Sequence, residues 1–165
     1  MEDYRAVERT FQTLVQVAGR AGREKNGNVV IQTYNPDHYA IIDSSKQDYD
    51  LFYNQEVALR KMLKYPPFCD IILISFSGKK LNQVKNISEY VYKKLISVQN
   101  ENINIYKPVP SPIDKIQNNY RWRIIIKCKV TSKVLDIINY AINDDKLKKS
   151  KETKIIVDIN PNTMN

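Results

Sequence analysis

The stretch "RWRIIIKCKV" at residues 121–130 alternates side chains of different character along much of its length. Successive side chains of a β-strand point to opposite faces of a sheet, so this period of two predicts a strand with one apolar and one basic face. The apolar face carries Trp122, Ile124, Ile126 and Cys128, and the basic face carries Arg121, Arg123, Ile125, Lys127 and Lys129. We expect the apolar face, Trp122 included, to lie in the core rather than on a ligand.

The segments around this strand predict the rest of a domain. In order they are a strand at 69–78 ("CDIILISFSG"), a long helix marked by the apolar stripe from Leu81 to Val98, a strand at 103–109 ("INIYKPV"), a loop containing "PSPIDKIQNNY", the 121–130 strand, a helix marked by Val134 and Ile138, and a strand at 154–159 ("KIIVDI"). The order βαββαβ is that of the ferredoxin-like fold, an α+β architecture in which two helices cover one face of an antiparallel sheet. Many functions use this fold, so the order alone indicates none of them.

The first part of the chain has a different organisation. Apolar residues at helical spacing predict an amphipathic helix over about residues 5–19, ended by Gly19 and Gly22, and "VVIQTY" at 29–34 predicts a strand. "NPD" at 35–37 predicts a turn in which Asp37 caps a short helix running through Ile42.

A connecting helix follows the turn. The pattern from about Tyr49 to Lys64 is helical, and "YPPF" at 65–68 ends it because proline cannot continue a helix and restricts the residue before it.

Charge and composition narrow the class of function. The 165 residues include 26 Lys and Arg against 18 Asp and Glu, a net charge of +8, which favours a polyanionic partner and nucleic acid before membrane.

The two cysteines form no CxxC pair and with one histidine they indicate no metal site. Without a signal peptide or a long apolar run, we expect a cytoplasmic protein. No P-loop, HExxH or GxSxG motif is present, which argues against a self-contained enzyme.

One short motif stands out near the start. "QVAGRAGR" at 16–23 places Arg20 and Arg23 three residues apart, each after a glycine. Flanking glycines let the backbone approach another lobe closely, and an arginine stabilises charge on a phosphoryl group. A solvated surface turn explains the same residues equally well on physical grounds.

The residues of this motif match the pattern of a known family. Gln16, Gly19, Arg20 and Arg23 fit the pattern QxxGRxxR, which resembles motif VI of superfamily 2 helicases. Together with it, the chain resembles the C-terminal portion of the PriA family of replication-restart helicases (primosomal protein N′). The segments that carry this likeness are "DYRAVERTFQTLVQVAGRAGR", "VVIQTYNPDHYAI", "FYNQEVALRKMLKYPPF", "PVPSPIDKIQNNYRWRIIIK" and "VDINP".

The resemblance implies an activity and a division of the chain. PriA-type proteins are ATP- and Mg²⁺-dependent 3′-to-5′ DNA helicases that recognise stalled or repaired forks and start primosome assembly. By this likeness Arg20 and Arg23 contact the phosphates, Gln16 couples the nucleotide to the motor, and Gly19 and Gly22 are hinges. Residues 1–36 would then end the second motor lobe, 37–66 would form a helical connector, and 67–165 would form the C-terminal domain, with forked DNA, single-stranded DNA-binding protein and other primosome proteins as partners.

The departures from the family pattern are also informative. The Walker lysine motif, the DExH carboxylates, the N-terminal DNA-binding domain and the cysteine-rich zinc region are not found in this sequence. We therefore expect a fragment that binds no cofactor and hydrolyses no ATP by itself. The alternative is a free-standing, non-catalytic nucleic-acid-binding or scaffold module of ribosomal-protein type.

A basic strand face is the predicted contact with DNA. Arg121, Arg123, Lys127 and Lys129 share one face of the 121–130 strand, where cations on an open surface would neutralise phosphates. Contact with the motor lobes, or plain solvation, remains the alternative reading of this face.

Overall fold

The computed structural model describes residues 3–21, 27–99, 102–144, 147 and 152–164. These residues contain five helices and a five-stranded sheet whose strand pairs are all antiparallel, so the chain is of mixed α+β class. Two compact units are present, Met1–Leu63 and Lys64–Asn165.

The first unit consists of three helices. They are α1 (Ala6–Ala21), α2 (Tyr39–Lys46) and α3 (Tyr49–Leu63). Phe11 of α1, Ala40 of α2 and Phe52 of α3 form its buried core, and the rings of Phe11 and Phe52 stack with their centroids 4.0 Å apart. The α3 helix ends directly before "YPPF", as the prolines predict.

Several local predictions for this unit need correction. Helix α1 continues through Gly19 to Ala21, and His38 rather than Asp37 caps α2, because its Nδ1 accepts a hydrogen bond from the Ala40 N–H at 3.2 Å. The strand predicted at 29–34 is wrong, since residues 27–33 are irregular and Val30 is 92% exposed. A strand is stable only when paired in a sheet, and the described residues supply no partner strand for this segment.

The second unit is built on the sheet. Its elements are β1 (Asp70–Gly78), α4 (Leu81–Ser97), β2 (Asn104–Ile105), β3 (Val109–Ile116), β4 (Asn119–Cys128), α5 (Ser132–Ile142) and β5 (Thr153–Ile159). The strands are ordered β2-β4-β1-β5, and β3 also pairs with β4. β2 pairs with the C-terminal part of β4 and β3 with its N-terminal part.

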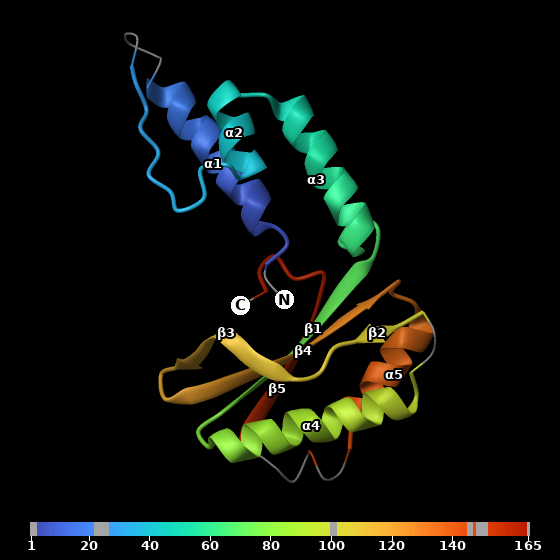
Figure 1. Ribbon diagram of the computed structural model, residues 1–165. Helices are drawn as coiled ribbons and strands as arrows, with labels where there is room; N and C mark the ends of the chain where they lie inside the picture. The colour runs from blue at the N-terminus through green and yellow to red at the C-terminus, as the bar shows by residue number, and fades with distance from the viewer. Residues whose placement is uncertain (1–2, 22–26, 100–101, 145–146, 148–151, 165) are drawn as a thin grey trace. The chain divides into compact units, whose positions relative to one another are not determined.

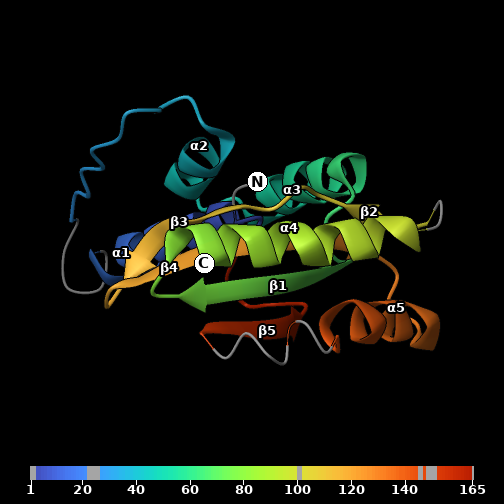
Figure 2. The same cartoon turned by 90° about the horizontal axis from the view of Figure 1, so that it is seen from below.

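Helices α4 and α5 lie together on one side of the sheet (Figure 1, Figure 2). The side chains between them and the sheet form the main core: Ile72, Ile74 and Phe76 of β1, Ile124, Ile126 and Cys128 of β4, Val84, Val91 and Leu95 of α4, and Val134, Ile138 and Ala141 of α5. Trp122 lies opposite Phe76 and is packed against this cluster. The prediction that Trp122 faces the core is therefore confirmed.

The edge of the sheet beside β4 differs from the sequence-based prediction. The predicted strand at 103–109 is reduced to Asn104–Ile105, and the predicted loop after it is mostly strand β3. Pro110 and Pro112 favoured a loop, but proline is tolerated in an edge strand because its missing N–H leaves only an outward bond unmade. Gln117 and Asn118 both have positive φ, as a tight two-residue hairpin turn requires.

No helix in the described part of the chain is both long enough and apolar enough to cross a bilayer.

Candidate functional site

Helix α1 carries the described part of the QxxGRxxR motif. Gln16 and Arg20 are four residues apart, so their side chains project from the same face of the helix, and both are exposed. Gly19 lies inside the helix, and a Cβ atom placed on it would meet nothing within 4 Å. Gly22 and Arg23 lie outside the described residues. Arg20 occupies the last turn of α1, where a cation interacts favourably with the negative end of the helix dipole.

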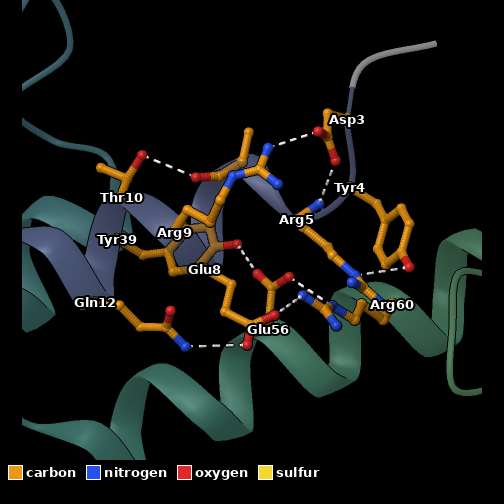
Figure 3. Close-up of polar contacts among 11 residues, drawn as sticks. Asp3, Tyr4, Arg5, Glu8, Arg9, Thr10, Gln12, Tyr39, Glu56 and Arg60 are labelled. Carbon is orange, nitrogen blue, oxygen red and sulfur yellow. Dashed lines mark hydrogen bonds and ion pairs between the residues drawn. The ribbon is translucent and has the colours of Figure 1, made fainter. Parts of the chain in front are cut away.

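The other end of α1 is held to α3 by a network of charges, shown in Figure 3. Arg60 of α3 donates from Nη2 to Glu8 Oε2 of α1 at 2.9 Å, and from Nε to Glu56 Oε1 at 2.7 Å. The Tyr39 hydroxyl of α2 donates to the other oxygen of Glu56 at 2.5 Å. Tyr39 of α2 and Arg60 of α3 therefore meet at the buried Glu56 carboxylate, and Arg60 extends the network to Glu8 of α1.

The hydrogen bonds of this network favour the charged form of Arg60 over the neutral form. Burial tends to lower the pKa of Arg60, but the hydrogen bonds to Glu56 and Glu8 outweigh it and raise that pKa. Burial, followed by the hydrogen bond to Glu56, raises the pKa of Tyr39. No sequence pattern predicts the ion pair between α1 and α3, because Glu8 and Arg60 are 52 residues apart. The Glu56–Arg60 spacing of four alone indicated a helical ion pair.

The basic face predicted on β4 is present, but much of it is covered. Arg123 is 4% exposed and donates from Nη1 to the Met164 carbonyl oxygen. Lys127 is 5% exposed, and its Nζ lies 3.6 Å from the centroid of the Tyr65 ring. Burial lowers the pKa of Lys127, with an opposing influence from Cys69.

The expectation of an open face at Arg123 and Lys127 is therefore wrong. Alternation along the strand shows which residues share a face, but not whether other segments cover that face. Arg121 is partly exposed and Lys129 is exposed, so these two cations remain available to a phosphate backbone.

Other aromatic and cationic side chains lie near the hairpin. Tyr106 is 42% exposed, and Lys115 of β3 lies over the Tyr120 ring at 5.0 Å from its centroid. Tyr106 and Lys115 are exposed and Tyr120 is partly exposed, so aromatic and cationic groups occur together at the surface of β3 and β4 and of the segment before β3.

The two cysteines have different surroundings. Cys128 is buried in the main core, as expected for a small apolar side chain on the apolar face of its strand. Burial raises the pKa of its thiol to about 11. Cys69 is partly exposed, and its thiol donates to the Lys64 carbonyl at 3.0 Å. Among the described residues, no three His, Cys, Asp or Glu side chains gather as metal ligands would.

Comparisons with known proteins find relatives that match both units of the chain. A family model, "Primosomal protein N C-terminal domain", matches residues 61–162. The replication restart protein PriA of Bacillus subtilis is 35% identical over 164 residues, which is 98% of this chain and 20% of the relative. Those of Borreliella burgdorferi and Chlamydia pneumoniae are each 36% identical over 98% of this chain, and the chain covers 24% and 21% of them respectively. The chain thus spans between a fifth and a quarter of the length of these curated relatives.

Proposed function

The chain belongs to the primosomal protein N C-terminal domain family, and from this premise we propose that it forms the C-terminal part of a replication-restart DNA helicase. The supporting observation is that the likeness to replication restart proteins extends over 98% of the chain, well beyond the 61–162 domain. It therefore includes α1, which carries Gln16 and Arg20.

We propose that α1 supplies one side of an ATP site in the complete motor. Arg20 and Arg23 then contact the phosphates of ATP, whose Mg²⁺ is held by the other lobe, and Gln16 couples the nucleotide to movement. The exposure of Gln16 and Arg20 on one helix face supports this role, because both side chains are available to a facing lobe. An arginine that stabilises transferring phosphoryl charge is worth roughly 10³–10⁵ in rate. Because glycine has no Cβ atom, Gly19 and Gly22 would let that lobe approach the backbone closely.

The groups that would bind ATP, Mg²⁺ and zinc belong, on this proposal, to the rest of the longer protein. The purified 165-residue chain should then hydrolyse no ATP, with or without DNA, because phosphoryl transfer needs a phosphate-binding loop and metal-holding carboxylates. Turnover above the buffer background would contradict this part of the proposal.

For the second unit we propose a ferredoxin-like domain that binds forked DNA and partner proteins. The strand order β2-β4-β1-β5, with two helices on one face, supports the fold assignment. The partly exposed Arg121 and the exposed Lys129 support contact with a phosphate backbone. Single-stranded DNA-binding protein and other primosome proteins, in the cytoplasm, are the partners that the family likeness suggests.

The experiment uses the full-length protein that contains this chain. Arg20→Ala and Arg23→Ala should each abolish most DNA-stimulated ATP hydrolysis and leave fork binding intact, because these side chains act on phosphoryl charge rather than on DNA. Lys61→Ala, which removes an exposed cation from α3, is the matched control and should hydrolyse ATP normally. Normal turnover in both arginine variants would refute the role of α1 in the ATP site.

A further inference from the structure

A hollow lies at the end of the sheet where β1 terminates, and the residues that line it have no role in the sites described above. Its volume is about 520 Å³. The lining residues are Ser77, Gly78, Lys79, Lys80, Asn119, Glu152 and Lys154. They come from the end of β1, the start of β4 and the start of β5, which are far apart in sequence. Three of the seven are lysines, and all the others are polar or glycine.

Strand register places a further cation beside these lysines. Ser77 of β1 lies opposite Arg121 of β4 on one side and opposite Lys154 of β5 on the other. Residues in register on neighbouring strands point to the same face, so Arg121 and Lys154 flank Ser77 in a row across the sheet. Two strand spacings separate the outer members of this row by roughly 10 Å.

The charge of the hollow is positive after its internal pairing is counted. Lys80 forms an ion pair with Glu152 at 3.1 Å, but the two side chains are 70% and 56% exposed, and such pairs are weak. Within the residues that the structure describes, no ion pair involves Lys79, Lys154 or Arg121. A row of cations remains, which fits the repeated charges of a polyanion better than a single carboxylate.

The backbone around the hollow is closely packed and offers further donors. A Cβ atom on Gly78 would lie 2.7 Å from the Glu152 carbonyl oxygen, so glycine is needed to bring the segments of Lys79 and Glu152 this close. Helix α4 begins at the rim, and its N-cap residue Lys80 makes no side-chain capping hydrogen bond. The first N–H groups of this 17-residue helix add positive potential beside the lysines.

A buried hydroxyl lies next to the same glycine. The Thr153 side-chain oxygen has no hydrogen-bond partner among the described residues, and it lies 3.3 Å from the Cβ position of Gly78. This oxygen is closed off from solvent and Thr153 does not line the hollow, so the hydroxyl offers no contact to a ligand bound there.

We propose that this hollow is a binding site for the phosphate backbone of a nucleic-acid strand, contacted by Lys79, Lys80, Lys154 and Arg121. The inference rests on the proposed DNA-binding function and assigns it to named residues. The lining contains no aromatic ring on which a base would stack, so the site recognises phosphates and is indifferent to base sequence.

The test measures DNA binding by the 165-residue chain across a salt series. The variant Lys79→Gln/Lys80→Gln/Lys154→Gln removes three charges from the hollow, and Lys61→Gln/Lys93→Gln/Lys133→Gln removes three exposed charges elsewhere. The probe is a labelled single-stranded oligonucleotide of mixed sequence, and a forked duplex is measured in parallel.

We expect the hollow variant to lose at least the two phosphate contacts of Lys79 and Lys154, while the contact of Lys80 is the weakest of the three because Glu152 competes for its charge. Two contacts on a single strand correspond to a fall of about 1.4 in the slope of log K against log salt, and to roughly 25-fold weaker binding at 0.1 M salt. The control variant should stay within about threefold of the unchanged chain, since exposed charges outside the contact act only at long range. Glu152→Gln should strengthen binding, because it removes the one carboxylate of the lining.

Each result decides between distinct conclusions. If the unchanged chain binds DNA and the hollow variant binds equally well, the inference is overturned while the proposed function stands. If the unchanged chain binds no DNA, both fail. Loss of binding to an acidic peptide such as polyglutamate, with DNA binding retained, would show that the hollow is a peptide site and would also overturn the inference.

Folding is controlled separately. Circular dichroism melting of each variant should match that of the unchanged chain, because the lysines of the hollow are exposed. Should the triple variant fail to fold, Lys79→Gln and Lys154→Gln are measured singly, and each should weaken binding by about fivefold at 0.1 M salt. Unchanged affinity in both single variants would refute the assignment.

Discussion

Replacing Arg60 by methionine tests whether the charge network holds the three N-terminal helices together. Arg60→Met keeps much of the side-chain length but removes the hydrogen bonds to Glu8 and Glu56. Glu56 retains only the Tyr39 hydroxyl among the partners described here, and its side chain is 9% exposed. The variant therefore leaves a nearly buried carboxylate without its cation.

The size of the effect follows from the exposure of each pair. Removing one partner of a buried ion pair costs about 3–5 kcal/mol, whereas an exposed pair contributes about 0–1 kcal/mol. The Arg60–Glu56 pair is near the buried limit, but the Arg60 side chain is still 14% exposed and Glu8 is 39% exposed. We therefore expect the free energy of unfolding of this unit to fall by about 2–3 kcal/mol, which for a unit of this size lowers Tm by roughly 10–20 °C.

The assay follows thermal unfolding by two signals. Helical circular dichroism includes α1, α2 and α3, whereas the fluorescence of the only tryptophan, Trp122, reports the sheet unit. Arg60→Met should move the circular dichroism transition, and Lys61→Met, on the exposed side of the same helix, should not. Adding Glu56→Gln to Arg60→Met should recover part of the loss, because the amide is neutral and still accepts a hydrogen bond from Tyr39.

Two results would refute this reasoning. One is a free energy of unfolding for Arg60→Met within about 0.5 kcal/mol of the unchanged chain, which is the range for ordinary surface substitutions. The other is an equal loss in Lys61→Met, which would assign the effect to the helix surface rather than to the buried carboxylate.

Three further predictions concern the sheet unit. Trp122→Ala should lower the free energy of unfolding by about 3–5 kcal/mol in urea titrations, because its ring packs against the main core; a change below about 1 kcal/mol would contradict that placement. Arg123→Glu should prevent folding or cost more than about 3 kcal/mol, since it puts a carboxylate beside the Met164 carbonyl, whereas Lys129→Glu should melt normally. The pKa of Cys128 is raised to about 11, so iodoacetamide at pH 8 should alkylate it at least roughly a hundredfold more slowly in the native chain than in urea. The protonated thiol is favoured by folding, so its contribution to stability is lost as pH rises from about 9 towards 11, and equal alkylation rates in the two states would contradict its burial.

Local patterns predicted most of the elements in the sheet unit. The alternation at 121–130 correctly placed Trp122 against the core, and the apolar stripe from Leu81 to Val98 matches α4. Proline at 66 and 67 correctly ended α3. These features depend on residues near one another in the chain, which is why the amino-acid sequence alone predicts them.

Features that depend on a partner segment were missed. β3 contains two prolines and is stable only because β4 lies beside it, so its own residues indicated a loop. The apolar run at 29–34 indicated a strand, but no described strand pairs with it. Strand formation depends on the neighbour as much as on propensity, and one segment's sequence does not contain that neighbour.

The sequence by itself determined which residues share a face of β4, where α3 ends, and the QxxGRxxR motif that first suggested the family resemblance. Only the tertiary structure decided that Arg123 and Lys127 are buried, because the groups that contact them, the Met164 carbonyl and the Tyr65 ring, come from distant parts of the chain. The same holds for the lysine-lined hollow, whose cations are brought together by pairing of β1 with β4 and β5. Periodicity fixes the direction of a side chain, and long-range packing fixes what that side chain meets.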